Sequence, residues 1–320
     1  MQPEIEKILG TLEILTQPFL RCNLPCHHGG NFVPFAWDVS EWGKFNICNL
    51  CRSNGWLQIT DPDATVKQWQ NMEYPRHFPD FNVSLEQQNF WRNKIEFLFQ
   101  LLQNNLTKLE SFFLIFKFDS HGGIYLPGII IGETKDGDWI GVSHTIYKET
   151  EILPEIIYRS EQIETDYNIL LGENTLYLIA KIQAITSELG TIEFGGDFGG
   201  EFSCDYPYNY DHKFVLTAAK TKELVFEKII QATECLEINY FYSFHPDIDY
   251  LRDWCYFKEN EAEEMYQRYN TINCFFQHNF EQTFMYRFSF WSKECIYILG
   301  QIQGKNLAGI YIESDFTYNP

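Results

Sequence analysis

Basic residues are scarce in this sequence, and those present are not clustered. The 320 residues contain 24 Lys and Arg against 44 Asp and Glu, which gives a formal net charge of -20 at pH 7. Nucleic-acid binding relies on clustered Lys and Arg that contact phosphates, so this composition disfavours direct binding of DNA or RNA. The negative charge fits either solubility or an acidic face that binds a basic protein, for example one whose own ligand is nucleic acid.

The sequence also lacks a long apolar run. No segment approaches the roughly 20 apolar residues that a membrane-spanning helix needs, and the first ten residues are acidic rather than basic. These features predict a cytoplasmic protein without membrane contact. The nine cysteines are odd in number and scattered, which favours reduced thiols over a disulfide framework.

Length and charge distribution indicate more than one domain. A chain of 320 residues is longer than one ordinary core requires, and 45% hydrophobic residues are enough for packed cores. Residues 1–150 hold 12 Lys and Arg against 17 Asp and Glu, whereas residues 151–320 hold 12 against 27. The excess of negative charge therefore lies mainly in the second half.

Two hairpin patterns that lie far apart in the sequence have the same design. Residues 129–133 and 139–142 are short β-branched and aromatic runs around a Gly/Asp turn, and residues 296–300 and 307–312 repeat this around a Gly/Asn turn. The glycines are equally spaced in both patterns: Gly132 and Gly141, Gly300 and Gly309. This repetition predicts a duplicated module.

Periodicity and capping residues extend the duplication to helices. Helices are predicted over residues 4–20, 61–69, 84–106, 217–236, 245–254 and 258–281. Strands are predicted over residues 32–37, 109–118, 124–133, 138–147, 284–290, 293–301 and 307–314. Residues 175–189 fit a helix slightly better than a strand.

These elements predict an α+β protein of two related α/β sandwich modules, each with helices packed on a mainly antiparallel sheet. The predicted boundaries are 1–150 for the first module, 151–216 for an acidic Gly-rich connecting segment, and 217–320 for the second module.

A cysteine-rich segment near the start is a candidate zinc site. Cys22 and Cys26 are followed about twenty residues later by Cys48 and Cys51, and four soft ligands from two loops can close a tetrahedron. Such a closed site would be structural rather than catalytic. The alternative is four free thiols beside the surface pair His27 and His28.

The glycine-rich run around residues 195–210 is a poor phosphate-binding loop. Its carboxylates Asp197, Glu201 and Asp205 would repel phosphate, and no helix with Lys or Ser/Thr at the right spacing follows. Together with Asp211 they also lack the regular spacing of a calcium loop. A flexible acidic loop is the simpler interpretation.

Catalytic motifs are weak. No two histidines have the spacing of a zinc protease or a deaminase. His144 fits an outward position on a strand, and His121 lies in a turn. His245 lies near Asp247 and Asp249, but Pro246 and Asp247 are better explained as a helix start. Catalysis is therefore the least favoured function.

Four successive features of the second half resemble the C-terminal part of the cyanobacterial nuclease A inhibitor family. They are the long helix, the strand over 285–290, the run Cys295-Ile-Tyr-Ile-Leu-Gly and the run Asn306-Leu-Ala-Gly-Ile. The first hairpin, with Gly132-Glu-Thr, resembles the same element, so the chain looks like two diverged tandem copies. The resemblance implies an α/β sandwich that presents carboxylates to a basic nuclease site. The family has an acidic motif after its opening helix, and the matching positions here, 21–24, hold no carboxylate.

The resulting functional hypothesis is a non-catalytic, acidic protein-binding module, inhibitor-like, that acts on a basic partner such as a nuclease. The candidate partner-binding residues are Glu237, Glu259, Glu261, Glu263, Glu264, Asp197 and Glu201. The alternative is a zinc-stabilised structural or regulatory protein with no nuclease partner, and no cofactor other than zinc is expected.

Overall fold

The computed structural model divides the chain into two compact units. It describes residues 3–17, 20, 27–71, 84–118, 122–125, 128–145, 158–163, 170–190, 192–196, 208–245, 249, 258–290 and 293–316. Unit 1 comprises Met1–Phe45, Lys148–Asp166 and Leu236–Pro320, and unit 2 comprises Asn46–Tyr147 and Tyr167–Cys235. Each unit is therefore assembled from segments that are distant in the sequence.

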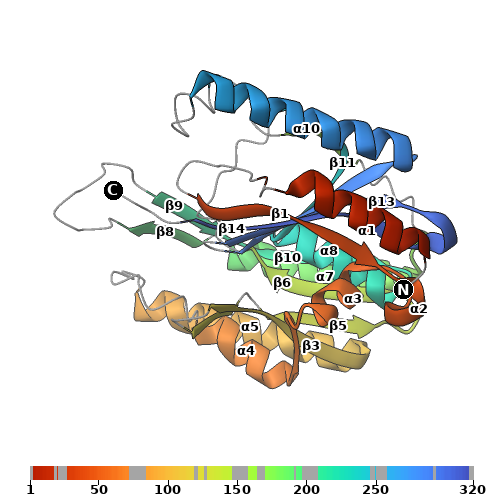
Figure 1. The fold of residues 1–320 in the computed structure, drawn as a ribbon. Coiled ribbons are helices and arrows are strands. Elements are labelled where there is room, and N and C mark those ends of the chain that lie inside the picture. Colours follow the sequence, from red (N-terminus) through yellow and green to blue (C-terminus); the bar gives the residue numbers. More distant parts are fainter. Residues whose placement is uncertain are drawn as a thin grey trace. The chain divides into compact units, whose positions relative to one another are not determined.

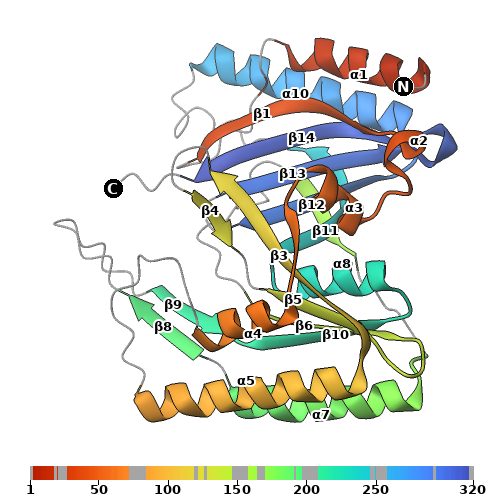
Figure 2. The ribbon, with the colours of Figure 1, turned by 90° about the horizontal axis from the view of Figure 1, so that it is seen from below.

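Unit 1 is built on an antiparallel sheet of six strands. Their order is β1 (His27–Trp37), β14 (Leu307–Phe316), β13 (Lys293–Gln301), β12 (Thr283–Phe290), β11 (Leu236–Phe244) and β7 (Tyr158–Gln162). Helices α1 (Pro3–Thr16) and α10 (Glu259–Asn279) cover one face of this sheet (Figure 2), and the short α2 (Val39–Trp42) follows β1. The turn between β13 and β14 contains a 3-10 turn, η1 (Gln303–Lys305).

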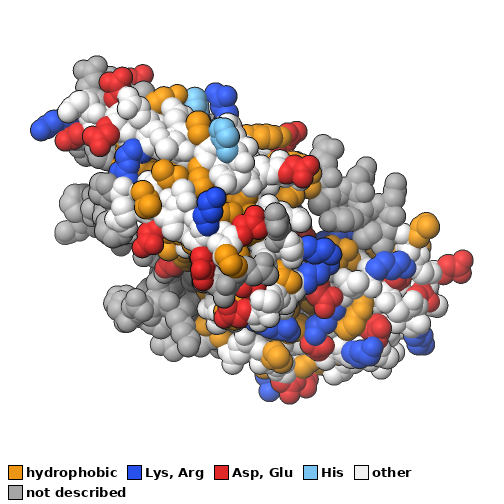
Figure 3. All heavy atoms as spheres, turned by 45° about the vertical axis from the view of Figure 1, so that its right-hand side comes forward, with side chains coloured by type: hydrophobic (Ala, Val, Ile, Leu, Met, Phe, Trp, Pro, Cys, Tyr) orange, Lys and Arg blue, Asp and Glu red, His pale blue; other side chains and the backbone are white. Residues whose placement is uncertain are grey.

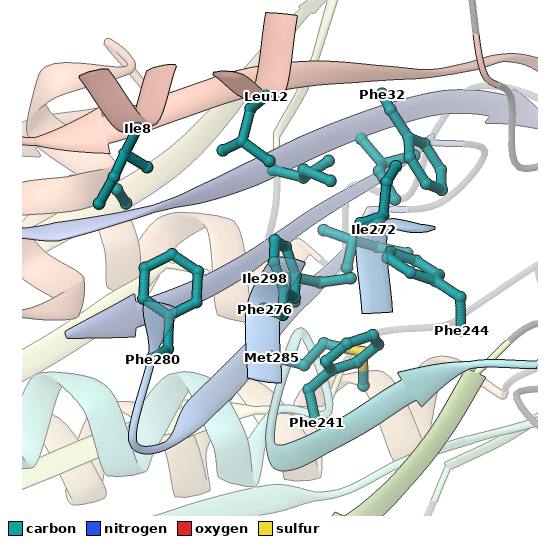
Figure 4. Packing of buried hydrophobic residues seen from close by; sticks show 14 of the residues in the cluster. Ile8, Leu12, Phe32, Phe241, Phe244, Ile272, Phe276, Phe280, Met285 and Ile298 are labelled. Atoms are coloured by element: carbon teal, nitrogen blue, oxygen red, sulfur yellow. The ribbon is translucent and has the colours of Figure 1, made fainter. Parts of the chain in front are cut away.

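The core of unit 1 lies between these two helices and the sheet. Ile8 and Leu12 of α1 and Phe276 of α10 point toward Ile298 of β13 and Met285 of β12 (Figure 4). Successive strand residues point to opposite faces, so alternate residues of β13 face the helices. The apolar stripes predicted for the first helix and the long second-half helix therefore define this core.

Unit 2 is built on a second antiparallel sheet. The strand order is β10 (Phe214–Ala219), β6 (Trp139–His144), β5 (Ile129–Glu133), β3 (Thr107–Phe118) and β2 (Leu57–Thr60), and β4 (Gly122–Tyr125) pairs with β3. A separate ribbon joins β8 (Ile192–Gly196) to β9 (Tyr208–His212).

Helices cover both faces of the unit 2 sheet. On one face α4 (Pro62–Asn71), α5 (Leu85–Asn105) and α7 (Glu173–Leu189) pack on Ile130, Ile140 and Val142. On the other face lies α8 (Lys222–Ala232), which contacts α3 (Ile47–Ser53). A Cβ on Gly141 would lie 2.8 Å from Val225 Cγ1, so this glycine lets α8 approach the sheet closely.

The two units repeat one plan. In unit 1, β11 is followed by the long α10 and then by β12, β13 and β14. In unit 2, β2 is followed by α4, the long α5 and then β3, β4, β5 and β6. Each unit is completed by a helix and a strand from a distant part of the sequence. Strand β1 pairs antiparallel with β14 in unit 1, and β10 pairs antiparallel with β6 in unit 2.

The completing elements are exchanged between the two halves of the chain. The opening helix and strand of the first half, α1 and β1, belong to the sheet of the second half. The corresponding α7 and β10 of the second half belong to the sheet of the first. Each half of the chain thus supplies the sheet of the other half with a helix and a strand.

The long helices of the two units match in length and in the spacing of their buried residues. Both α5 and α10 contain 21 residues. Their buried faces match in spacing: Ile95, Leu98 and Leu102 in α5, and Tyr269, Ile272 and Phe276 in α10. Each helix also ends on an asparagine whose amide donates to the carbonyl four residues earlier, Asn105 in α5 and Asn279 in α10.

The hairpin glycines have matching roles. A Cβ on Gly132 would lie 2.8 Å from Leu106 Cβ, and a Cβ on Gly300 would lie 2.1 Å from the ring of Phe280. Leu106 and Phe280 are the C-cap residues that directly follow α5 and α10. In both copies, a glycine on the first hairpin strand therefore makes room for the end of the long helix.

The hairpin turns hold the exchanged elements. In unit 2, Asp138 accepts from Gly172 N at 2.7 Å and from Lys220 Nζ at 2.5 Å, which ties the turn to the start of α7 and the end of β10. Asp136 accepts from Thr175 N at 3.0 Å and so caps α7, whose own cap residue is a glycine. In unit 1, Asn306 Oδ1 accepts from Val39 N at 2.8 Å, just after β1.

Most elements agree with the sequence-based prediction. The α+β class, the two antiparallel sheets, both hairpins and the helical state of residues 175–189 are confirmed. The helix predicted over 217–236 is shorter, because residues 217–219 complete β10 and Thr221 caps α8 by accepting from Leu224 N. The predicted helix over 245–254 falls mainly outside the described residues.

The predicted segments 1–150, 151–216 and 217–320 do not map one to one onto the two units, because strand pairing joins the halves in both sheets. Among the described residues, no helix combines the length and apolar character needed to cross a membrane.

Candidate functional site

The start of α10 presents carboxylates to solvent. Glu263 and Glu264 are exposed, and neither forms an ion pair among the described residues. Glu261 is also exposed, and its carboxylate accepts from Lys258 N at 3.0 Å, which closes a capping box at the helix start. Glu259 is the first residue of α10, and its side chain lies outside the described part of the structure.

Glu237 is positioned differently, because it belongs to a charged cluster on the sheet. It lies on β11 directly opposite Arg287 of β12, and Arg287 Nη1 donates to Glu237 Oε2 at 3.1 Å. Arg287 also donates to Glu294 Oε1 of β13, from Nη2 at 2.7 Å and from Nε at 3.1 Å. Ser289 Oγ donates to the same oxygen at 3.3 Å.

Burial dominates the electrostatics of this cluster. Glu294 is fully buried and Arg287 is 5% exposed, whereas the Glu237 side chain is 39% exposed. Removal from water raises the pKa of the Glu294 carboxyl, and the charge and hydrogen bonds of Arg287 act against that rise. Glu237 is therefore the solvent-facing member of a cluster whose other members lie inside the unit.

Glu237 and the start of α10 belong to different elements of unit 1. Where β11 contacts α10, Phe241 packs on Phe276, and Phe244 packs on Tyr269 and is hydrogen-bonded by the side chain of Asn273. These contacts lie in the middle and second half of α10, so they do not place Glu237 beside the helix start. The described acidic side chains at the start of α10 are therefore those of Glu261, Glu263 and Glu264, and Asp197 and Glu201 lie outside the described residues.

Charges of both signs are mixed on the face that Figure 3 shows. On the face drawn in Figure 3, Asp and Glu side chains are interspersed with Lys, Arg and hydrophobic side chains. In the sequence, the segments of unit 1 contain 11 Lys and Arg against 23 Asp and Glu, and those of unit 2 contain 13 against 21. Unit 1 is therefore the more acidic of the two.

The candidate zinc ligands do not form a described site. Cys48 and Cys51 both lie on α3 in unit 2 and are buried, and Cys22 and Cys26 lie outside the described residues. Burial raises the pKa of both described thiols, most strongly that of Cys51. Thiols must deprotonate to bind zinc, and the described residues contain no group of three or more ligands suited to a metal ion.

The histidines discussed as catalytic candidates are separate from one another. His144 is on β6, against the ring of Phe214, and burial lowers its pKa to about 4. It is thus less solvent-facing than its predicted outward position. The exposed His245 contacts Arg159, with Nε2 and Nη2 3.2 Å apart. Asp247 and His121 lie outside the described residues.

Sequence reasoning missed Arg287 and Glu294 as members of the cluster. The signal was present in the strand alternation: Arg287 follows Met285 by two residues, and Met285 faces the core. A charged residue at an inward position needs a partner, and Glu294 lies on the next strand of the same hairpin.

Comparison with known proteins adds no assignment, since no family model, no curated protein and no solved structure matches this chain.

Proposed function

We propose that this protein binds a basic protein partner through the carboxylates at the start of α10 in unit 1. The observation that carries the proposal is the divergence of the two long helices. The positions of α5 that correspond to Glu259, Glu261, Glu263 and Glu264 hold Leu85, Gln87, Asn89 and Phe90. Since α5 forms the same 21-residue helix without them, the fold does not require four glutamates here.

Helix stability alone explains only part of this acidity. Carboxylates near a helix N-terminus interact favourably with its dipole, but the effect fades within the first turn. Glu263 and Glu264 follow that turn, and both are exposed. Exposed charges of one sign accelerate the encounter with a partner of opposite charge, and they contribute to specificity more than to affinity.

A nuclease is the partner class we infer. Its active site holds Lys and Arg for phosphates and often a divalent metal ion, and exposed carboxylates are suitable ligands for both. This inference rests on the resemblance of the two hairpins to the nuclease inhibitor family and on the acidic unit 1. It implies a binding protein that acts without catalysis of its own.

The test combines binding and inhibition. Titration of the full chain into a basic, sugar-nonspecific nuclease should slow DNA cleavage, and the variant with Glu263→Gln and Glu264→Gln should bind about fivefold more weakly, because each exposed ion pair contributes roughly 0.5 kcal/mol. Added salt should weaken binding by the wild type more than binding by the variant.

The matched control is the variant with Glu86→Gln and Glu96→Gln, which removes two exposed carboxylates from α5. It should bind the nuclease as the wild type does. No slowing of cleavage at a large excess of the protein would rule out the nuclease. Equal weakening by both variants would show that net charge, and not the start of α10, determines binding.

A further inference from the structure

The helix layer of unit 2 carries exposed aromatic side chains at positions where the long helix of unit 1 has polar residues. On α5, Phe90 is 43% exposed and Phe97 is 55% exposed. The corresponding positions of α10 hold Glu264 and Thr271, which are both exposed. Because both layers belong to the same module, the fold does not require aromatic residues at these positions.

These side chains form a stripe along the seam between α5 and α7. Lys94 lies over the ring of Phe90, with Nζ 5.7 Å from the ring centroid, and it pairs with Glu188 of α7. On α7, Lys181 Nζ lies 4.3 Å from the ring centroid of Tyr177, which is 64% exposed. The stripe, which we call the seam face, comprises Phe90, Lys94, Phe97, Tyr177, Lys181 and Glu188.

The seam face is nearly neutral in a strongly acidic chain. Helices α5 and α7 together carry three basic and four acidic residues, whereas α1 and α10 carry two basic and seven acidic residues. Like charges brought together across an interface are unfavourable. Of these two equivalent helix layers, the one formed by α5 and α7 is therefore the one on which a second copy of this acidic chain meets less repulsion.

The mixed charges suit a partner with the same surface. A two-fold interface places one patch against itself, so it needs apolar groups that meet each other and charges of both signs that can pair. Phe97 and Tyr177 supply the apolar groups, while Lys181 and Glu188 supply opposite charges. A strongly basic or strongly acidic partner would instead favour a surface of a single sign.

The available area agrees with a weak dimer. The 17 residues of α7 correspond to a length of about 26 Å, and two neighbouring helices present a width of about 20 Å. Two such faces bury about 1,000 Å² in total, which is the lower limit of a specific interface. The complex should therefore form and dissociate within the micromolar concentration range.

We infer that the seam face of unit 2 is a self-association surface, on which two copies of this chain pair about a two-fold axis through α5 and α7. The inference is independent of the partner proposed for unit 1. The two proposals predict opposite effects of salt. Added salt should strengthen self-association, because it screens the repulsion between two acidic chains, whereas it should weaken binding to a basic partner.

Sedimentation or light scattering of the full chain between about 5 µM and about 200 µM tests this. The wild type should pass from the 37.9 kDa of one chain toward twice that mass, and added salt should promote the change. The variant with Phe97→Glu and Tyr177→Glu should stay monomeric. Phe97→Ser, which introduces no charge, should weaken the dimer about tenfold.

The control is Ile14→Glu, which adds a carboxylate at a residue that is 75% exposed on α1 of unit 1. It should dimerise as the wild type does, and circular dichroism should show all variants folded. A wild type that remains monomeric at every concentration would overturn the inference. So would a dimer that persists in the variant with Phe97→Glu and Tyr177→Glu.

Discussion

Replacing Arg287 by methionine should lower the free energy of unfolding by about 3 to 5 kcal/mol, the usual effect of removing one partner of a buried ion pair. Glu294 is fully buried and takes two hydrogen bonds from Arg287. Without the guanidinium, a carboxylate would remain in the protein interior with Ser289 as the remaining donor among the contacts described above. Urea unfolding at neutral pH measures the loss.

The loss should depend on pH. Burial already raises the pKa of Glu294 in the folded protein, and removal of Arg287 raises it further. A carboxyl with a raised pKa binds more protons in the folded state than in the unfolded state, so its contribution to stability falls as the pH rises. The variant should therefore be closest to the wild type in mild acid and furthest from it at neutral pH.

Neutralising the partner provides the control. In the double variant with Arg287→Met and Glu294→Gln, no buried charge remains, so part of the lost stability should return. If Arg287→Met costs less than about 1 kcal/mol and shows no dependence on pH, the cluster does not contribute to the stability of unit 1 in the way described.

Gly309→Ala should destabilise the protein by about 3 kcal/mol, the upper part of the usual range for overpacking. A Cβ at this position would lie 1.9 Å from Ile298 O, a backbone atom of the neighbouring strand, so β13 and β14 would have to separate. This would disturb the hairpin that receives β1. Thermal or urea unfolding of the full chain measures the effect.

The equivalent glycine of unit 2 provides the comparison. A Cβ on Gly141 would meet the side chain of Val225 at 2.8 Å instead of a backbone atom, and α8 can shift slightly to make room. Gly141→Ala should therefore cost about 1 kcal/mol. Equal costs for the two substitutions would show that the glycines are not constrained by the different neighbours seen here.

The sequence predicted the local elements well, because their signals are local. The Gly/Asp turn before Trp139 and the Gly/Asn turn before Leu307 were sufficient to place both hairpins. The apolar residues at helical spacing likewise placed α5 and α10. The sequence analysis did not predict α2, α3 or the strands β2, β7, β8, β9, β10 and β11. For β10 and β11 the reason is that Thr217–Ala219 and the run after Glu237 also fit neighbouring helical or irregular interpretations.

The exchange of α1 and α7 between the halves could not be predicted from the spacing of apolar residues in the sequence. An apolar face such as that of Ile5, Ile8 and Leu12 indicates that a helix packs on a sheet. It does not indicate on which of the two sheets the helix packs. The same limit applies to the candidate site. Glu261, Glu263 and Glu264 could be identified as an acidic helix start, whereas the partnership of Glu237 with Arg287 depends on the register of β11 and β12.

The two proposed surfaces lie on equivalent helices of the two units. These helices bury equivalent positions in the separate cores of their units, so the exposed residues that differ between them are free to serve different contacts. Glu264 in α10 and Phe90 in α5 occupy the same position of the module. Equivalent helices of the two units thus carry an acidic start in α10 and the aromatic residues of the seam face in α5.

The central claim, that each unit needs both halves of the chain, is tested most directly by cutting the chain once. A protease site inserted after residue 150 separates the two halves covalently, while β1 remains paired with β14 and β10 remains paired with β6. After cleavage, the two fragments should elute together like the uncut protein and separate only in denaturant. Fragments that separate under native conditions, as two independent modules, would contradict the account.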